Sequence, residues 1–524
     1  MNRPAVWGRP LLIASASIGL FVAALDAYVV VTLLPAMLFD LDLSIDRIEQ
    51  ATPIISGFLA GYIVVMPLIG LASDVHGRGR AYAGSLVIFA VGSAVTATAG
   101  STGEPPFGWW GLPWLVLGRI LQGVGGGAMV PIALALVADH FQASARATAI
   151  GVVAAVQETG SVLGPIYGAG LAALAADHGG WRAVFWLNLP LALLCGVGFL
   201  WAMRRSGPAG SGENRAAPKA TVDWPGAIAL GLGLALLVVA LYPDQPARSA
   251  VGTQFVPAGA GALLALGAWG YRQVNLLSPV IPRALLGSRQ FLGSSLANLL
   301  VGAGLMVALV DTPIMARGVF GLDQLGAAAL LARFMVAVPV GALAGGWASD
   351  RLGGPLAAAL GLAAAAAGFF LMAGWDAQEL HRSLGPLREA DAVLALTGLG
   401  FGFVIAPLAT AVLGVAARDR QGLAASLVVL VRTLGMLAGL AALSAFGLHR
   451  FYELFNAGPK LRLIPGSSDF AAQKLAYEAR VTQALVAEYH GVFLLAALLC
   501  VVAGVVAVAG LSARSSAGTT TRSR

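Results

Sequence analysis

The feature that most constrains this chain is the repetition of apolar segments long enough to cross a membrane. An α-helix rises about 1.5 Å per residue, so roughly 20 apolar residues cross a hydrocarbon core that is ~30 Å thick. Such segments recur to the end of the sequence, in which 58% of the residues are hydrophobic and only 11% are charged. The mean hydropathy of +0.82 lies outside the range of soluble globular domains. The sequence therefore predicts an all-α membrane protein.

We predict fourteen transmembrane helices, at residues 11–39, 51–72, 81–100, 113–138, 147–175, 183–203, 223–242, 255–273, 291–316, 325–348, 355–374, 391–414, 421–446 and 484–511. The basic residues between them, such as Arg204 and Arg205, gather on the side that also holds both termini, whereas most acids lie on the other side. By the positive-inside rule, the N- and C-termini are cytoplasmic. We therefore expect a multi-pass protein of the cell inner membrane. Because topology accounts for most of the net charge of +7, no nucleic-acid partner is expected.

Internal repetition divides the chain into two halves. Gly70–Gly79 resembles Gly345–Gly354, which aligns Asp74 with Asp350, and at nearly the same offset Glu158 aligns with Arg432. We predict an N-terminal six-helix half (1–203), a cytoplasmic linker with two inserted transmembrane helices (204–284), and a C-terminal six-helix half (285–524). Parallel repeats about an axis along the membrane normal are typical of the major facilitator fold.

Two regions stand apart from the repeated halves. The two inserted helices act either as spacers or as a shield over a lateral opening. Residues 447–483, named the extension here, are predicted to lie outside the membrane, where the last helix projects and pairs with a continuation of the helix before it. The alternative for the extension is a solvated loop.

Six charged residues inside the apolar spans are the candidate functional residues. A charge in the middle of a bilayer costs at least ~2.5 kcal/mol and is expected to face the interior of the bundle or a water-filled cavity. They are Asp26, Arg119, Glu158, Asp311, Arg333 and Arg432. Asp311 and Arg333 lie nearer the outer ends of their spans and are secondary candidates.

Glu158 and Arg432 occupy equivalent positions in the two halves, so we expect them to face each other across a central cavity. An adjacent arginine favours the charged carboxylate, whereas an apolar environment favours the protonated form. A movement that joins and separates the two residues would bind and release a proton. We predict that Glu158 and Asp26 couple transport to a proton gradient without a cofactor. The alternatives are a static ion pair, or an acid that serves only helix packing.

Polar residues at the predicted cytoplasmic face form a candidate latch. Asp74 ends a helix and is followed by Arg78 and Arg80. The carboxylate can accept hydrogen bonds from the start of a neighbouring helix, and the arginines can pair with acids of adjoining helices. Arg119 lies among glycines and requires buried acceptors.

Three motifs extend the case from residues to a family. GLASDVHGRGR (70–80), LVLGRILQGVGGG (115–127) and GSVLGPIYGAG (160–170) resemble the motifs of major facilitator drug:proton antiporters. LDAYVVVTLLP (25–35) and WRAVFWLNLP (181–190) are similar to the fourteen-helix subfamily. Within it, ALDAYVVVT (24–32), QETGSVLGPIYG (157–168), VRTLGMLAGLAALSAFGL (431–448) and the extension most resemble mycobacterial efflux transporters. This resemblance implies export of triacylglycerol and related glycolipids together with an LprG-type lipoprotein.

The resemblance implies roles for particular residues. It implies that Asp26, Asp74, Glu158 and Arg432 are needed for transport. The antiporter motif contributes Gly160, Gly164, Pro165 and Gly168, whose glycines allow close approach of a neighbouring helix and whose proline kinks its own. The loop ASDRLGG in the second half lacks the second arginine of the first, so the paired latch is expected to be lopsided.

Competing functions remain at this stage. The first is proton-coupled export of lipids such as triacylglycerol or glycolipid, by a monomer that works with an LprG-like lipoprotein. The second is a multidrug:proton antiporter for amphipathic drugs. A membrane enzyme is disfavoured because the sequence contains neither H-E-x-x-H nor G-x-S-x-G, and Cys195 and Cys500 show no metal-binding spacing.

Overall fold

The computed structural model describes residues 8–41, 52–100, 111–175, 180–206, 223–241, 254–384, 387–456 and 470–512. Within these ranges, thirteen helices are long and apolar enough to cross a membrane, which confirms the predicted all-α membrane class. The remaining predicted span, 255–273, is also helical, as α8 (Phe255–Asn275). Glycines and a polar C-terminal turn make α8 less apolar than the others. The predicted linker residues 207–222 and residues 457–469 of the extension lie outside the described residues.

Six helices precede the inserted pair. They are α1 (Gly8–Asp40), α2 (Thr52–His76), α3 (Arg78–Ala97), α4 (Gly111–His140), α5 (Ala143–Leu174) and α6 (Trp181–Ser206). Within this group, the buried α4 packs closely against α2 and α3, and α1 packs closely against α5. Runs of glycine in α4 allow this: a Cβ on Gly125 would lie 2.5 Å from the backbone nitrogen of Phe89.

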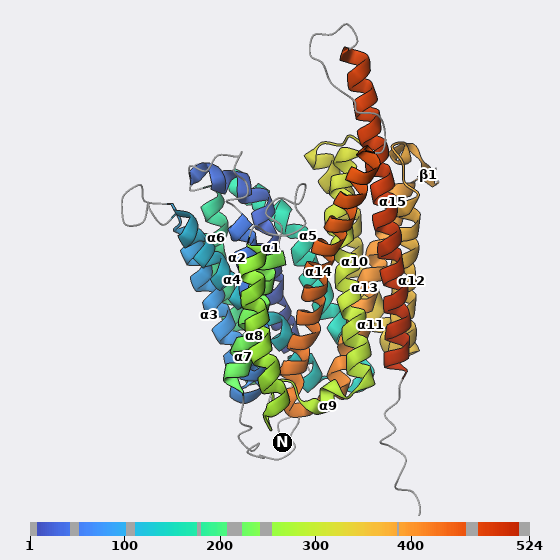
Figure 1. Ribbon diagram of the computed structural model, residues 1–524. Helices are drawn as coiled ribbons and strands as arrows, with labels where there is room; N and C mark the ends of the chain where they lie inside the picture. The colour runs from blue at the N-terminus through green and yellow to red at the C-terminus, as the bar shows by residue number, and fades with distance from the viewer. Residues whose placement is uncertain are drawn as a thin grey trace, which may run out of the picture.

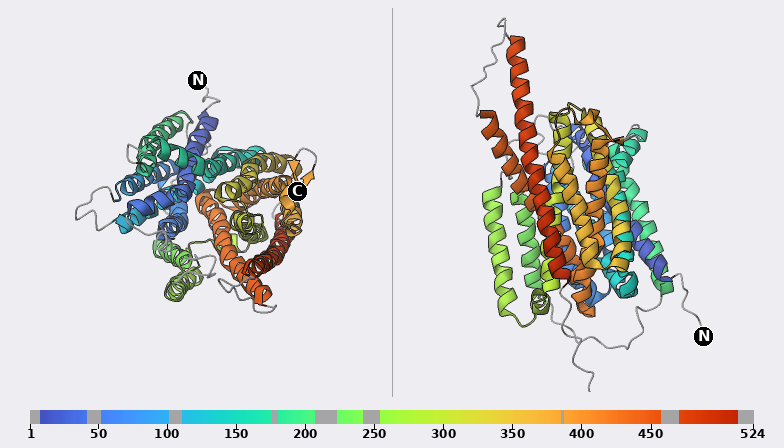
Figure 2. Two further views of the ribbon diagram at one scale, coloured as in Figure 1. Left: turned by 90° about the horizontal axis from the view of Figure 1, so that it is seen from above. Right: turned by 90° about the vertical axis from the view of Figure 1, so that its right-hand side faces the viewer.

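Six helices follow the inserted pair and the short helix α9 (Arg283–Leu286). They are α10 (Arg289–Gly318), α11 (Gln324–Leu352), α12 (Gly354–Ala373), α13 (Glu389–Val415), α14 (Gln421–Asn456) and α15 (Phe470–Leu511). Their apolar side chains form a core of their own, in which Phe334, Phe369, Phe401 and Phe493 are fully buried. Seen from above, the two six-helix groups lie side by side (Figure 2).

The two groups meet through four pairs of helices: α2–α14, α4–α14, α5–α11 and α5–α13. The inserted helices α7 (Trp224–Leu241) and α8 form a hairpin beside the N-terminal group, where α7 packs on α2 and also touches α14. Burial opposes ionisation of Asp223, but hydrogen bonds from Arg272 and the Gly226 N–H hold the pKa of Asp223 below its ordinary value. The ion pair between Asp223 and Arg272 joins the start of α7 to the end of α8 and so closes the base of the hairpin.

The extension is helical on both sides of its undescribed tip. Helix α14 runs through to Asn456, and α15 begins at Phe470 and continues for 42 residues. The rings of Phe455 and Tyr477 meet edge to face at 5.6 Å, so the two helices pair as the sequence predicts. Figure 1 shows α15 rising beyond the ends of the other helices. We call this the extension end, and the opposite end, where Asp74 and Asp350 lie, the latch end.

Candidate functional site

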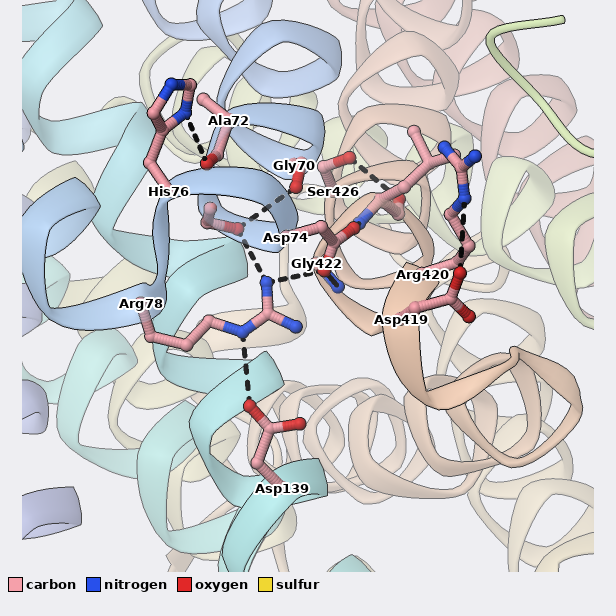
Figure 3. Close-up of polar contacts among 12 residues, drawn as sticks. Gly70, Ala72, Asp74, His76, Arg78, Asp139, Asp419, Arg420, Gly422 and Ser426 are labelled. Carbon is pink, nitrogen blue, oxygen red and sulfur yellow. Dashed lines mark hydrogen bonds and ion pairs between the residues drawn. The ribbon is translucent and has the colours of Figure 1, made fainter. Parts of the chain in front are cut away.

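Asp74 joins the two halves at the latch end. One carboxylate oxygen accepts the backbone N–H of Gly422 at 2.9 Å, and the other accepts that of Leu423 at 3.0 Å. Both donors are at the start of α14, where unpaired N–H groups and the helix dipole favour a negative charge. A carboxylate of the N-terminal half thus caps a helix of the C-terminal half (Figure 3).

Asp350 makes the equivalent contact in the opposite direction. Its carboxylate accepts the backbone N–H groups of Ala147 at 3.1 Å and Thr148 at 2.7 Å, near the start of α5. The two halves are therefore joined twice, by related bonds between α2 and α14 and between α11 and α5. The expected lopsidedness does not extend to the carboxylates.

The arginines of the two latches do differ. Arg78 binds Asp74 at 2.6 Å and Asp139 of α4 at 3.1 Å, so it ties the first latch to its own half (Figure 3). Arg351 instead lies over the Trp347 ring, with its guanidinium carbon 4.3 Å from the ring centroid. Arg80 is exposed and forms no ion pair with a described residue, so the structure does not join it to the latch.

Glycines bring the two halves into backbone contact beside each latch. A Cβ on Gly70 would lie 2.9 Å from the Leu423 Cα, and a Cβ on Gly346 would lie 2.6 Å from the Ala147 carbonyl oxygen. Real side chains do not tolerate these separations without movement of the backbone. The latch end is therefore closed by packing as well as by hydrogen bonds.

Asp26 and Arg119 form a buried ion pair inside the N-terminal half. Arg119 donates to Asp26 at 2.8 Å, and both residues are about 1% exposed. The carboxylate also accepts the side-chain amides of Gln122 at 2.9 Å and Asn188 at 2.6 Å. The Arg119 guanidinium additionally stacks 4.4 Å above the centre of the Phe58 ring. The network links α1, α4 and α6, and it does not include Glu158 or Arg432.

Glu158 and Arg432 meet at the centre of the molecule, as predicted. The distance from Arg432 Nη2 to Glu158 Oε1 is 3.9 Å, which is longer than a hydrogen bond, and both side chains are partly exposed. Neither side chain makes a hydrogen bond to another residue that the structure describes. The pair is therefore close enough to attract but retains open hydrogen-bonding capacity.

Two pockets adjoin this pair and share Glu158, Arg432 and Ile405. The extension-side pocket is lined by Tyr28, Ser161, Val162, Val301, Leu305, Leu309, Phe334, Met335, Val338 and Phe401. The latch-side pocket is lined by Val130, Leu134, Val153, Ala154, Gln157, Asn298, Ala409, Val428 and Val429. Both halves contribute to each pocket. The cavity is mostly aliphatic and aromatic, with its charged residues confined to one level.

The antiporter-motif glycines face α1. A Cβ on Gly160 would lie 2.5 Å from the Phe21 carbonyl oxygen, and one on Gly164 would lie 2.7 Å from that of Leu25. A Cβ on Gly168 would instead meet the side chain of Val29. The Pro165 carbonyl accepts the Thr32 hydroxyl at 3.2 Å. These residues fix α5 against α1, and thereby set the position of Glu158.

Asp311 and Arg333, the secondary candidates, lie in the C-terminal half away from the Glu158–Arg432 pair. Arg333 pairs with Asp391 of α13 at 3.1 Å, and Asp311 is within electrostatic reach of Glu488 on α15. Asp391 and Glu488 also fall inside predicted spans, and the sequence-based choice of six charges omitted them. Both were visible as acids near the ends of apolar segments.

A buried acid lies outside the membrane-spanning helices, between α12 and α13. Glu379, on the 3₁₀ turn η4 (Glu379–His381), is fully buried and binds Arg382 at 2.7 Å. The turn leads into a two-residue hairpin of β1 (Ser383–Leu384) and β2 (Leu387–Arg388). Burial and the nearby Glu389 raise the pKa of Glu379, and Arg382 offsets part of this rise.

Comparison with known proteins places these observations in context. A family model described as Major Facilitator Superfamily matches residues 16–440. The chain is 39% identical over 501 residues to a triacylglyceride transporter of Mycolicibacterium smegmatis, covering 94% of this chain and 86% of the relative. It is 37% identical over 502 residues to a triacylglyceride transporter of Mycobacterium tuberculosis, covering 94% and 93% of the two chains.

Solved structures with similar folds are more distant in sequence. A human organic anion transporter superimposes with a TM-score of 0.61 at 19% identity, covering 94% of this chain and 99% of the other. A proton:xylose symporter superimposes with a TM-score of 0.57 at 14% identity, covering 94% of each chain. These likenesses concern the fold alone.

Proposed function

Because the chain belongs to the Major Facilitator Superfamily and is a membrane transporter rather than an enzyme, we propose that it exports neutral lipids in exchange for protons. The substrates would be lipids such as triacylglycerol or glycolipid, and the membrane the cell inner membrane, with both termini cytoplasmic. The observation that carries the proposal is the loose Glu158–Arg432 pair in an apolar cavity between the halves.

The pair supports a coupling step because its two members come from different halves. When the halves hold Arg432 near Glu158, the arginine favours the carboxylate; when they separate, the apolar cavity favours the protonated acid. Asp26 already accepts bonds from Arg119, Gln122 and Asn188. Protonation of Asp26 would weaken the ion pair with Arg119, whereas Glu158 makes no such bond, so we take Glu158 as the primary proton site.

The latch supplies the conformational step of a transport cycle. With both carboxylates bound to helix starts of the opposite half, the latch end is closed. Release of these bonds would allow that end to open, and the substrate would then reach the cavity from the cytoplasmic side. Alternation between the two arrangements is the general behaviour expected of two packed halves around a fixed central site.

Three observations favour a neutral lipid over an amphipathic cation. The charges of Glu158 and Arg432 in the pocket lining cancel, so the lining has no unpaired acid that would bind a cation. The relatives named triacylglyceride transporters cover nearly the whole chain. The extension carries exposed Tyr452 and Leu475, which suit transfer to a carrier such as an LprG-type lipoprotein. Each CH₂ exposed to water costs about 0.8 kcal/mol, so a long acyl chain needs a continuous apolar path.

The test is lipid export by protein reconstituted in proteoliposomes, with and without a proton gradient. Glu158→Gln, which matches the protonated acid in shape, should fold normally and lose gradient-driven export. The matched control is Glu478→Gln, which changes an exposed glutamate on the extension. Export by Glu158→Gln at the normal rate, with the normal dependence on the gradient, would contradict the proposed coupling.

A second variant separates the lipid exporter from the multidrug antiporter. Replacing most of 447–483 with a short Gly/Ser bridge removes the helices beyond the membrane. A drug that leaves into water should still be exported, whereas delivery of lipid to an acceptor should fail although the protein still responds to the gradient. Full lipid export after truncation would favour the drug antiporter.

A further inference from the structure

Polar side chains divide the central cavity at one level, named the waist here. The waist comprises Glu158 and Arg432, which line both pockets, together with Tyr28 and Ser161 at the edge of the extension-side pocket. The hydroxyl of Tyr28 is within hydrogen-bonding reach of the Ser161 side chain. Above and below the waist, most of the lining residues are apolar. A ligand that fills both pockets must therefore place its polar part at this level.

The waist offers more donors than acceptors. The Arg432 guanidinium has five N–H donors, and it makes no hydrogen bond to any residue in the described part of the chain. The hydroxyl of Tyr28 adds a donor, whereas that of Ser161 already donates to the Gln157 carbonyl at 3.4 Å. Glu158 is the carboxylate of the waist, and at 3.9 Å it leaves the guanidinium unsaturated. Asn298 adds nothing, because its amide already donates to the Val428 carbonyl at 2.6 Å.

Surplus donors in a cavity without net charge indicate the chemistry of the ligand. A free carboxylate or phosphate would bring a charge with no remaining counter-charge, because Arg432 already faces Glu158. An ester carbonyl accepts hydrogen bonds, donates none and carries no charge. Several esters joined to acyl chains satisfy both the waist and the pockets.

We propose that the waist binds the ester carbonyls of a neutral glyceride, with Arg432 and Tyr28 as donors, while its acyl chains divide between the two pockets. The inference rests on the proposed lipid transport and adds the group that is recognised. Arg432 then has two partners in the cycle, the carboxylate of Glu158 and the carbonyl of the substrate. Tyr28 acts as a specificity-determining residue.

The experiment compares binding of trioleoylglycerol with that of its triether analogue, which has the same chains and no carbonyl, to the purified full-length protein. Hydrogen bonds to a charged donor are worth about a factor of ten or more, so the wild type should prefer the triester by roughly that factor. Tyr28→Phe should reduce the preference, and Arg432→Gln should reduce it further. Both variants should retain the thermal transition of the parent.

The control variant is Leu305→Ala, which shortens an apolar wall of the extension-side pocket. It should weaken binding of both lipids equally and leave their ratio unchanged. Equal binding of triester and triether by the wild type, or a preference that survives in both waist variants, would overturn carbonyl recognition while leaving lipid transport intact. Failure of the wild type to bind either lipid would instead remove the proposed function, and this inference with it.

Discussion

The paired latch predicts how strongly each aspartate holds the latch end closed. In Asp74→Asn, one oxygen remains to accept a backbone N–H of α14, but the charge and one of the two acceptors are lost. Hydrogen bonds to charged groups contribute about 1.5–3 kcal/mol, and a carboxylate at a helix start contributes about 0.3–1 kcal/mol more. We therefore expect a loss of about 2 kcal/mol, which shifts the equilibrium toward the open latch roughly 30-fold.

Asp350→Asn should have a similar effect, because its carboxylate makes the same two bonds near the start of α5. The two aspartates share no partner, so their effects should add. The double variant should lose about 4 kcal/mol, close to a thousandfold shift in the same equilibrium. The first latch retains Arg78, which can hold the substituted side chain in part, so Asp350→Asn is expected to be the more disruptive single change.

The assay is the distance between spin labels placed on the two halves at the latch end. Arg80→Cys and Leu352→Cys provide exposed positions, one in each half. The native cysteines, Cys195 and Cys500, are buried and can be replaced beforehand. Double electron–electron resonance should show a second, longer distance between the labels. Its population should increase from the parent to each single variant and further to the double variant.

Asp139→Asn is the matched control for this experiment. It removes a carboxylate that binds Arg78 within the N-terminal half and leaves the bonds between the halves in place. Its distance distribution should equal that of the parent. If the double latch variant also equals the parent, the two aspartates do not hold the halves together and the reasoning is refuted.

Three further predictions concern stability. Asp26→Asn should lower it by about 3–5 kcal/mol, because it leaves the Arg119 guanidinium buried without its carboxylate; thermal unfolding in detergent should show the loss, and adding Arg119→Gln should recover part of it. Gly435→Ala places a methyl group against a backbone carbonyl of α10 and should cost about 1–3 kcal/mol, whereas Gly84→Ala, with open space around it, should stabilise α3 by up to about 1 kcal/mol. Because the pKa of Glu379 is raised, its contribution to folding should be present in full below the ordinary value of 4.5 and decline as the pH rises through the raised value; hydrogen exchange of the surrounding turn should follow that decline and become flat in Glu379→Gln.

The spans and the central pair could be predicted from the sequence because each has a local signal. A helix that crosses lipid needs an uninterrupted apolar run, and a charge within such a run stands out. Glu158 and Arg432 also share a depth in repeated halves, so their meeting could be expected before the fold was known. The projection of α15 beyond the membrane could be predicted because no proline or glycine interrupts the sequence between Asp469 and Gly491.

The partners of those residues had no such signal. Gln122 and Asn188 are neutral and look like many other polar residues in helices, and their bonds to Asp26 depend on the rotation of three helices. The sequence alone therefore led us to predict only a coupling role for Asp26, whereas the ion pair with Arg119 also predicts that Asp26→Asn lowers stability. The latch shows the same limit, since Asp74 and Asp350 bind backbone N–H groups, which every residue but proline possesses.

The continuity of α15 has a mechanical consequence. A helix of 42 residues is about 63 Å long, and the same rod runs from the core of the C-terminal half to the outermost described part of the extension. Each degree by which that half tilts about the latch end sweeps the far end of the rod through roughly 1 Å, given that length. The rod therefore works as a lever that magnifies a small rotation in the bilayer. A single fluorophore near Phe470 would report the tilt angle of the whole C-terminal half. A partner bound there would be displaced each time that half tilts.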